Sequence, residues 1–185
     1  MLSTVGHGTL GRPELGALLH AHGIGQLVDV RRFPGSRRHP DLSGDALAGW
    51  LPGLAIGYRW EERLGGRRRL PAGEPVVDTW WTVPAFAAYA AHTRSDQFRL
   101  GMDQLVDEAT RTAVAVLCSE AVWWRCHRRL IADVASLTRG LEVRHLMHTG
   151  RPIAHRPAAG ALVRHDGLVV WDAAPPPEDP APSSG

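Results

Sequence analysis

Lysine is absent from this chain of 185 residues, so all 21 of its basic side chains are arginines. The absence excludes Schiff-base chemistry and Walker-type phosphate binding, since both need a lysine amine. Apolar stretches long enough to cross a bilayer are also missing, and the N-terminus lacks the charged region, apolar run and cleavage site of a signal peptide. We therefore expect a cytoplasmic protein with no membrane partner.

Cysteine is scarce as well. Cys118 and Cys126 are the only two, and they do not form a Cys-x-x-Cys pair for dithiol redox chemistry. In the cytoplasm both thiols should stay reduced. The net charge of +2 is too small for strong non-specific binding to duplex DNA. The hydrophobic fraction of 44% and the seven tryptophans are typical of a folded globular protein.

Strand-like and helix-like segments alternate along the chain, a pattern typical of βαβ units. We expect strands at 2–7, 26–31, 56–60, 112–118 and 142–147, helices at 12–22, 45–51, 84–109 (one or two) and 123–139, and a hairpin at 162–171. The pattern predicts an α/β fold with a single Rossmann-like domain over residues 1–172. Its sheet should be mainly parallel, with flanking helices and a C-terminal β-hairpin. Residues 173–185 are rich in proline and should form a disordered tail.

Ionisable side chains stand at the ends of three predicted strands. His7 ends the first, Asp29 and Arg31 end the second, and Cys118 with Glu120 ends the strand at 112–118. In parallel sheets, ligands bind outside the carboxyl ends of the strands. We therefore expect these groups to form one site, in which Asp29 orients Arg31 through an ion pair.

The densest group of reactive side chains is the stretch Cys118-Ser-Glu120 … Cys126-His127-Arg128. Cys126 is expected near the N-terminus of the helix at 123–139, where backbone amides and the helix dipole favour a thiolate. This makes Cys126 a candidate nucleophile and Glu120 a candidate acid or base if it is partly desolvated. His127 is a candidate second acid or base, or an orienting group. The arginine-closed loop of Cys-based phosphatases and rhodaneses is absent, because the positions where its arginine would follow either cysteine hold other residues.

Metal binding is a second interpretation of the same stretch. Zinc and iron accept thiolate, imidazole and carboxylate, so Cys118, Glu120, Cys126 and His127 are candidate ligands. Adjacent Cys126 and His127 on a helix would point in different directions, however, and structural zinc sites usually have closer cysteine pairs. We therefore assign no metal ligand and no cofactor from the sequence. A third interpretation is that these four residues stabilise the fold.

Clustered arginines favour a phosphate-bearing ligand. Guanidinium groups bind phosphate in bidentate fashion, and nearby tryptophans offer faces on which a base can stack. The arginines lie in the loop after the second strand, after the Gly65-Gly66 turn and at the start of the last long helix: Arg31, Arg32, Arg37, Arg38, Arg67, Arg68, Arg69 and Arg128. We expect Arg31 and Arg128 to clamp the anion.

Four motifs occur together in a fixed order: Thr4-Val-Gly-His7, Asp29-Val-Arg31-Arg-Phe-Pro34-Gly-Ser36-Arg37, Tyr58 followed by Leu64-Gly-Gly66, and Cys118-Ser-Glu120 … Cys126-His-Arg128. In these motifs the sequence resembles the bacterial domain-of-unknown-function family 488, over about residues 1–147. The resemblance supports the fold and the location of the site, and it implies no particular reaction.

We expect an enzyme that acts on a nucleotide, a nucleic acid or another phosphate-bearing substrate, by hydrolysis or group transfer, at the C-terminal edge of the sheet. The candidate catalytic residues are Glu120, Cys126 and His127. The candidate substrate-binding residues are His7, Asp29, Arg31, Ser36, Arg37, Cys118 and Arg128. The alternative is a non-catalytic module that binds a nucleotide, a metal or a nucleic acid. The sequence defines no oligomeric state.

Overall fold

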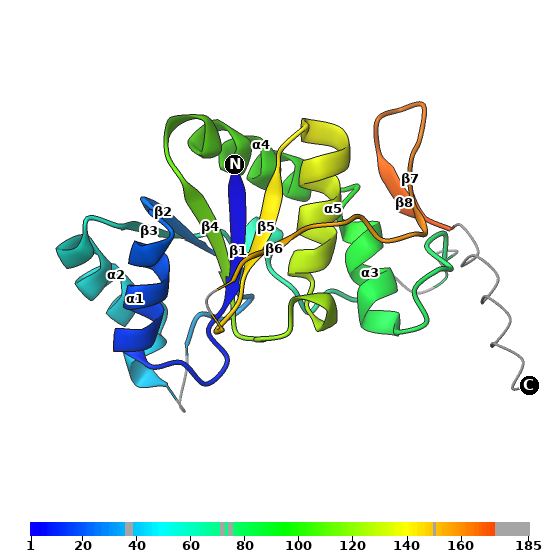
Figure 1. Ribbon diagram of the computed structural model, residues 1–185. Coiled ribbons are helices and arrows are strands. Elements are labelled where there is room, and N and C mark those ends of the chain that lie inside the picture. Colours follow the sequence, from blue (N-terminus) through cyan, green and yellow to red (C-terminus); the bar gives the residue numbers. More distant parts are fainter. Residues whose placement is uncertain (36–38, 71–72, 74–75, 150, 173–185) are drawn as a thin grey trace, which may run out of the picture.

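Six strands form one sheet in the computed structural model, which describes residues 1–35, 39–70, 73, 76–149 and 151–172 (Figure 1). Their order across the sheet is β3-β2-β4-β1-β5-β6. The strands are β1 (Leu2–Gly6), β2 (Gln26–Asp29), β3 (Gly57–Trp60), β4 (Val114–Cys118), β5 (Val143–Leu146) and β6 (Ile153–Ala154). Strands β1 to β5 pair in parallel, whereas β6 runs antiparallel to β5. The predicted α/β fold with a mainly parallel sheet is confirmed.

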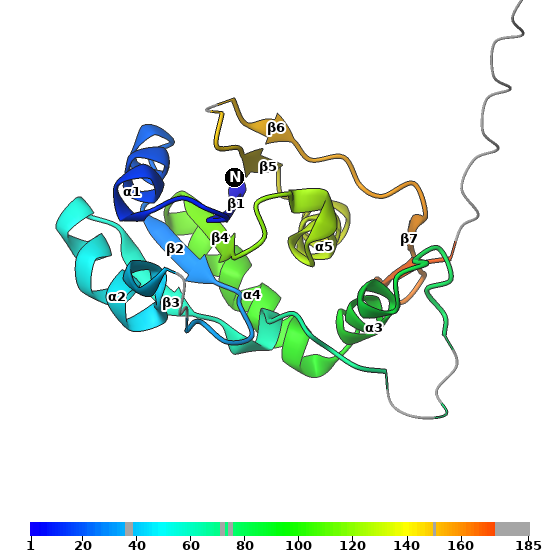
Figure 2. The same cartoon turned by 90° about the horizontal axis from the view of Figure 1, so that it is seen from below.

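Helices cover both faces of this sheet and give the fold three layers (Figures 1 and 2). Helices α1 (Arg12–Ala21) and α2 (Gly44–Trp50) lie on one face, and α3 (Pro84–His92), α4 (Asp96–Arg111) and α5 (Arg128–Arg139) lie on the other. Alternate residues of β4 point into the two cores, because side chains alternate along a strand. No helix in the described part of the chain is both long and apolar enough to cross a membrane.

Short 3₁₀ turns connect several of these elements, namely η1 (Pro40–Leu42), η2 (Leu51–Leu54), η3 (Glu62–Leu64) and η4 (Trp123–Arg125). The position of η4 shows that the start predicted for the last long helix is wrong. The helix expected at 123–139 begins only at Arg128, because η4 ends at Arg125 and Cys126 has an extended backbone (φ −125°, ψ 146°). Cys126 therefore precedes α5 instead of lying in its first turn.

The segment 84–109 forms two helices, α3 and α4. Ser95 is the N-cap of α4, because its hydroxyl accepts a hydrogen bond from the Phe98 amide (3.2 Å). The second helix therefore begins directly after Ser95. Helix α5 ends at Gly140, whose φ of +62° is the left-handed conformation typical of a helix C-cap.

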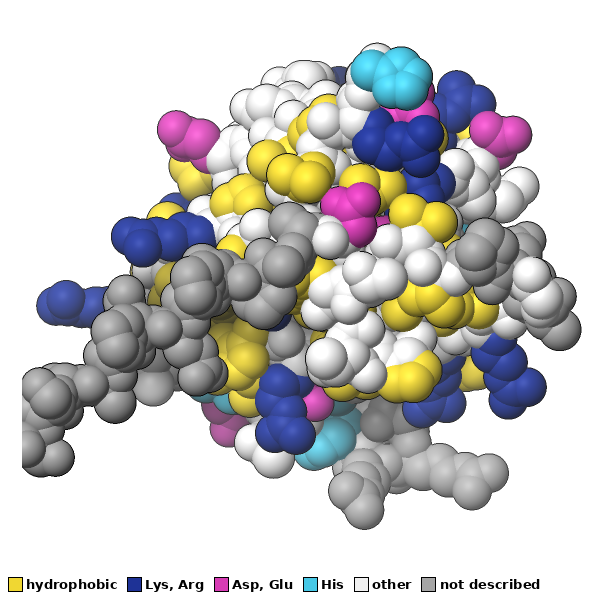
Figure 3. Space-filling model, turned by 90° about the vertical axis from the view of Figure 1, so that its right-hand side faces the viewer, with side chains coloured by type: hydrophobic (Ala, Val, Ile, Leu, Met, Phe, Trp, Pro, Cys, Tyr) yellow, Lys and Arg dark blue, Asp and Glu magenta, His cyan; other side chains and the backbone are white. Residues whose placement is uncertain are grey.

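The C-terminal hairpin predicted at 162–171 is present as β7 (Ala161–Val163) and β8 (Val169–Trp171). It lies on the side of the molecule that also carries α3, where apolar and charged side chains are interspersed (Figure 3). Trp171 is fully buried and anchors the hairpin in the core shared with α3 and α5. The tail at 173–185, which the sequence predicts to be disordered, lies outside the described residues.

A buried carboxylate on α5 attaches the C-terminal segment to the rest of the fold. Asp133 accepts hydrogen bonds from Nε2 of His155 (2.8 Å), the Ala158 amide (3.2 Å) and Nε1 of Trp171 (2.8 Å). These partners come from separate parts of the segment that follows β5. One carboxylate thus joins α5 to three separate points of this segment.

His145 on β5 extends the network into the sheet. Its Nε2 lies 3.0 Å from Nδ1 of His155, its Nδ1 lies 2.7 Å from the Thr4 hydroxyl, and its ring stacks on Trp123. Burial lowers the pKa of His145 to about 3, and the charges of His155 and Arg128 add to the effect. A neutral His145 can accept from Thr4 and donate to His155, so each ring nitrogen of the two histidines has a partner.

Replacing the central carboxylate should destabilise the protein strongly. In Asp133→Ala three buried donors lose their acceptor, and each unsatisfied group costs about 1–3 kcal/mol. We expect the free energy of unfolding in urea to fall by at least about 3 kcal/mol. Asp103→Ala is the matched control, since Asp103 is half-exposed and its ion pair with Arg139 lies at the surface. A similar loss in both variants would contradict the role of Asp133.

Stability should also fall in mild acid, because the folded protein keeps His145 neutral. Its pKa is about 3 in the folded state and about 6.5 in an unfolded chain, so below pH 6.5 the unfolded state binds the extra proton. This stabilisation is complete above pH 6.5 and is lost as the pH falls towards 3, by about 2 kcal/mol at pH 5. Urea unfolding at pH 7.5 and pH 5 measures the loss. His145→Gln should lose about 2 kcal/mol less than the wild type, and an equal loss would contradict the assignment.

Candidate functional site

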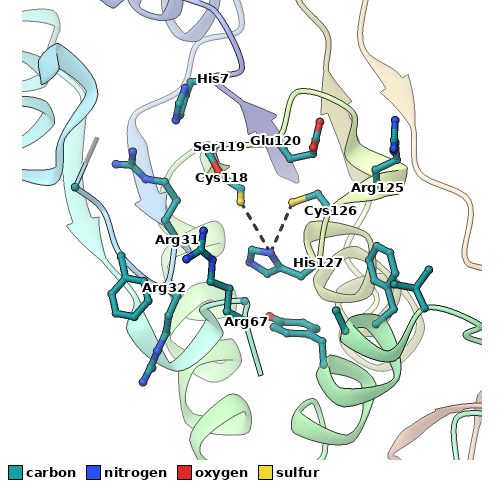
Figure 4. A pocket seen from close by; sticks show the side chains of 17 residues that line it. His7, Arg31, Arg32, Arg67, Cys118, Ser119, Glu120, Arg125, Cys126 and His127 are labelled. Carbon is teal, nitrogen blue, oxygen red and sulfur yellow. Dashed lines mark hydrogen bonds between the residues drawn. The ribbon is translucent and has the colours of Figure 1, made fainter. Parts of the chain in front are cut away.

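A cavity of about 540 Å³ lies at the carboxyl ends of β1, β2 and β4 (Figure 4). The parallel register explains why, since Gly6 pairs with Cys118 and Asp29 pairs with Leu117. The predicted site residues that line the cavity are His7, Arg31, Cys118, Glu120, Cys126 and His127. Asp29 and Arg128 contact this lining from behind. Ser36 and Arg37, together with Arg38, lie outside the described residues.

Asp29 and Arg31 form a buried ion pair in the cavity wall. Nε of Arg31 donates to Oδ1 of Asp29 (2.9 Å), Nη2 donates to Oδ2, and Nη1 donates to the Leu42 carbonyl (2.8 Å). Tyr58 also donates to Asp29, at 3.0 Å. The ion pair expected from the sequence is present. Because its donors already have protein partners, Arg31 supplies a fixed positive charge to the cavity. It is not free to close around an anion in the way expected from the sequence.

His7 faces the same cavity as a neutral imidazole. Its Nδ1 lies 3.1 Å from the Gly8 carbonyl and is assigned as the donor of that contact, so Nε2 is left as an acceptor. Burial lowers the pKa of His7 to about 4, and the charge of Arg31 contributes to the shift. At neutral pH His7 can therefore accept a proton or a hydrogen bond from a bound molecule.

The two cysteines and His127 meet at the floor of the cavity (Figure 4). Nδ1 of His127 lies 3.9 Å from Sγ of Cys118 and 3.7 Å from Sγ of Cys126. Nε2 of His127 lies 3.1 Å from the Val30 carbonyl, which can only accept, so the proton is on Nε2 and Nδ1 presents a lone pair to both sulfurs. The expectation that adjacent Cys126 and His127 diverge is wrong, because α5 begins only after them.

Arg128 supports the floor from behind. It is almost fully buried, its Nε donates to Sγ of Cys126 (3.3 Å), and its Nη2 donates to the Glu120 carbonyl. Burial raises the pKa of Cys126, but the hydrogen bond from Cys118 and the charge of Arg128 outweigh it and lower the pKa to about 6. The hydrogen bond to Cys126, together with burial, raises the pKa of Cys118 to about 12. Cys126 is thus the more acidic of the two thiols.

Two glycines lie so close to His127 and Arg128 that a side chain would not fit at either position. A Cβ at Gly66 would lie 2.8 Å from Nδ1 of His127, and a Cβ at Gly6 would collide with the Glu120 carbonyl and lie 2.6 Å from Nη2 of Arg128. Both close approaches therefore need a residue without a side chain. The glycines come from β1 and from the loop after η3, so the site depends on segments far apart in the sequence.

Glu120 lies on the rim and is exposed, not partly desolvated. Its Oε1 accepts a hydrogen bond from the Val122 amide (3.1 Å), and its carboxylate points away from His127 in Figure 4. It is nevertheless the only carboxylate among the described residues that line the cavity. If Glu120 transfers protons, it must therefore exchange them with a substrate bound at the mouth of the cavity.

Three further residues complete the rim. Phe33 is 65% exposed, and the guanidinium of Arg67 lies 6.0 Å from the centre of its ring. Arg67 has a left-handed backbone (φ +57°), which is uncommon for a residue with a side chain and is found disproportionately at functional sites. Arg67 and Arg125 are exposed, and neither pairs with a carboxylate of the described residues. Sequence reasoning gave Phe33 and Arg125 no binding role.

The family comparison covers most of the residues that form this cavity. The family model described as "Domain of unknown function DUF488" matches residues 13–135, which include the second strand, both cysteines, His127 and Arg128. His7 precedes the matched region. Neither the curated proteins nor the solved structures contain a match to this chain. The matched region covers more than half of the sequence, and the chain therefore belongs to the DUF488 family.

Proposed function

We propose that this protein is an enzyme that acts on a nucleotide or another phosphate-bearing substrate, by hydrolysis or group transfer, in the cavity at the carboxyl end of the sheet. One observation carries the proposal. Arg67 and Arg125, which pair with no described carboxylate, line opposite sides of the cavity that Cys126 and His127 also line (Figure 4). The guanidinium of Arg67 lies 6.0 Å from the centre of the exposed Phe33 ring. The combination joins anion recognition, an aromatic face and reactive groups in one cavity.

The cavity suits a ligand with one charged and one flat apolar part. Guanidinium groups bind phosphate oxygens in bidentate fashion, and an exposed aromatic ring can stack on a base. Val83 and Phe86 add apolar lining. A volume of about 540 Å³ falls within the usual range for small-molecule sites. A nucleotide, free or at the end of a nucleic acid, meets all of these conditions.

The reactive groups lie deeper than the binding groups. Cys126 and His127 form the floor, and Glu120 offers a carboxylate at the mouth that can exchange protons with a substrate held by the arginines. His7 adds a neutral acceptor on the opposite side of the cysteines from α3 (Figure 4). We also infer a cytoplasmic location, because both cysteines are free thiols.

Removing the two rim arginines should weaken nucleotide binding. Arg67→Ala with Arg125→Ala removes two phosphate-binding groups, and charge-assisted hydrogen bonds contribute about 1.5–3 kcal/mol each, so we expect at least a roughly tenfold rise in Kd. Calorimetric titration with a panel of nucleoside mono-, di- and triphosphates measures it. The matched control is Arg99→Ala with Arg111→Ala, which removes the same charge from the exposed face of α4. Equal affinity in both double variants would contradict the proposal.

Glu120→Gln should abolish turnover of the bound nucleotide without unfolding the protein. The variant keeps an oxygen that can accept from the Val122 amide, and the side chain is exposed, so the melting temperature should change by only a few degrees. Loss of an acid or base lowers the rate about 100-fold or more. Product release from the bound nucleotide is the measurement, with exposed Glu142→Gln as the control. Full activity in Glu120→Gln excludes this role, and nucleotide binding with no turnover in the wild type identifies a non-catalytic module instead.

A further inference from the structure

Three ligand atoms on the cavity floor have the spacing of a metal site. Sγ of Cys118, Sγ of Cys126 and Nδ1 of His127 all lie within 4.8 Å of one another, and no other group of three potential ligands of this kind occurs among the described residues. The two sulfur–nitrogen distances are 3.9 and 3.7 Å. Zinc binds sulfur at about 2.3 Å and nitrogen at about 2.05 Å, so tetrahedral geometry separates these two ligands by about 3.6 Å. Both distances lie within about 0.3 Å of that value.

We propose that Cys118, Cys126 and His127 bind one zinc ion, whose fourth coordination position opens into the cavity. All three residues line the cavity, so the remaining position faces the space that a substrate would occupy. Three protein ligands and one open position are typical of catalytic zinc, whereas structural zinc has four protein ligands. The proposal concerns the same cavity as the proposed function, but metal binding does not depend on the identity of the substrate.

The chemistry of the three ligands favours zinc. Two thiolates and one imidazole select a borderline-soft ion over magnesium or calcium, which prefer oxygen. The imidazole already has the tautomer that a metal requires, because the Val30 carbonyl accepts the proton of Nε2 and leaves the lone pair of Nδ1 directed at the sulfurs. Contacts of this kind hold a ligand in place before the ion arrives.

The surroundings also suit a bound cation with thiolate ligands. Nε of Arg128 donates to Sγ of Cys126, a contact that stabilises negative charge on the sulfur. The cysteines are buried, so water does not compete with the ion on that side, while the cavity provides a path for its entry. The absence of a Cβ at Gly66 leaves room for the His127 ring in the position that this geometry needs.

Metal content of the purified full-length protein tests the site directly. We expect about one zinc ion per chain by elemental analysis after growth with zinc and purification without chelator. Cys118→Ser, Cys126→Ser and His127→Gln should each lower zinc affinity at least about tenfold, measured by competition with a chromophoric chelator. His20→Gln, on the exposed face of α1, is the control and should retain the metal.

A cobalt titration of the metal-free wild type gives an answer that does not depend on how well the variants fold. Thiolate-ligated tetrahedral cobalt should produce intense visible bands and a sulfur-to-metal charge-transfer band that saturates at about one ion per chain. Absence of these bands, or zinc binding that none of the three substitutions weakens, would overturn the proposal. So would alkylation of Cys126 at the same rate with and without saturating zinc. Nucleotide binding is tested separately, by titration of the variant that lacks Arg67 and Arg125, so failure of one proposal is distinguishable from failure of the other.

Discussion

The buried guanidinium of Arg128 is the contact on which the geometry of the site depends. It donates hydrogen bonds to the Glu120 carbonyl and to the sulfur of Cys126. The end of β4 and the start of α5 are thereby held together, and the segment between them forms a closed loop. A buried charge is tolerated only where such partners surround it, and removing them leaves a large desolvation penalty. Gly6 makes the contact possible, since any side chain there would occupy the same space. Strand β1, the returning loop and helix α5 are therefore fixed together.

Burial separates four of the arginines near the cavity into two groups with different roles. Arg31 and Arg128 are buried and bonded to protein acceptors, so they shape the walls and contribute a constant positive potential. Arg67 and Arg125 are exposed, and only such side chains can rearrange around an incoming anion. The sequence cannot separate the two groups, because the assignment depends on acceptors such as the Leu42 and Glu120 carbonyls that only the folded chain brings into range.

Much of the fold and part of the site could be predicted because both follow from local patterns. Apolar runs mark the strands, and parallel pairing then brings His7, Arg31 and Cys118 to one edge. The start of α5 differs from the prediction, since Cys126 has an extended backbone and its sulfur contacts the buried Arg128 side chain, and no local propensity indicates either feature. The hydrogen bond from His127 to Val30 spans 97 positions, and that between His145 and Thr4 spans 141. No periodicity in a sequence reports contacts of that range.

Charge on the cavity floor connects the two proposals. Ionised cysteine close to a bound phosphate would repel it, and this repulsion would oppose the attraction of the rim arginines. A zinc ion shared by Cys118 and Cys126 cancels the charge of two thiolates and leaves Arg128 as a net positive group behind them. The floor would then attract the same phosphate that the proposed function assigns to Arg67 and Arg125 on the rim. A metal at this position would thus remove the repulsion at the floor, and Glu120 at the mouth would remain as the acidic group among the described residues that line the cavity.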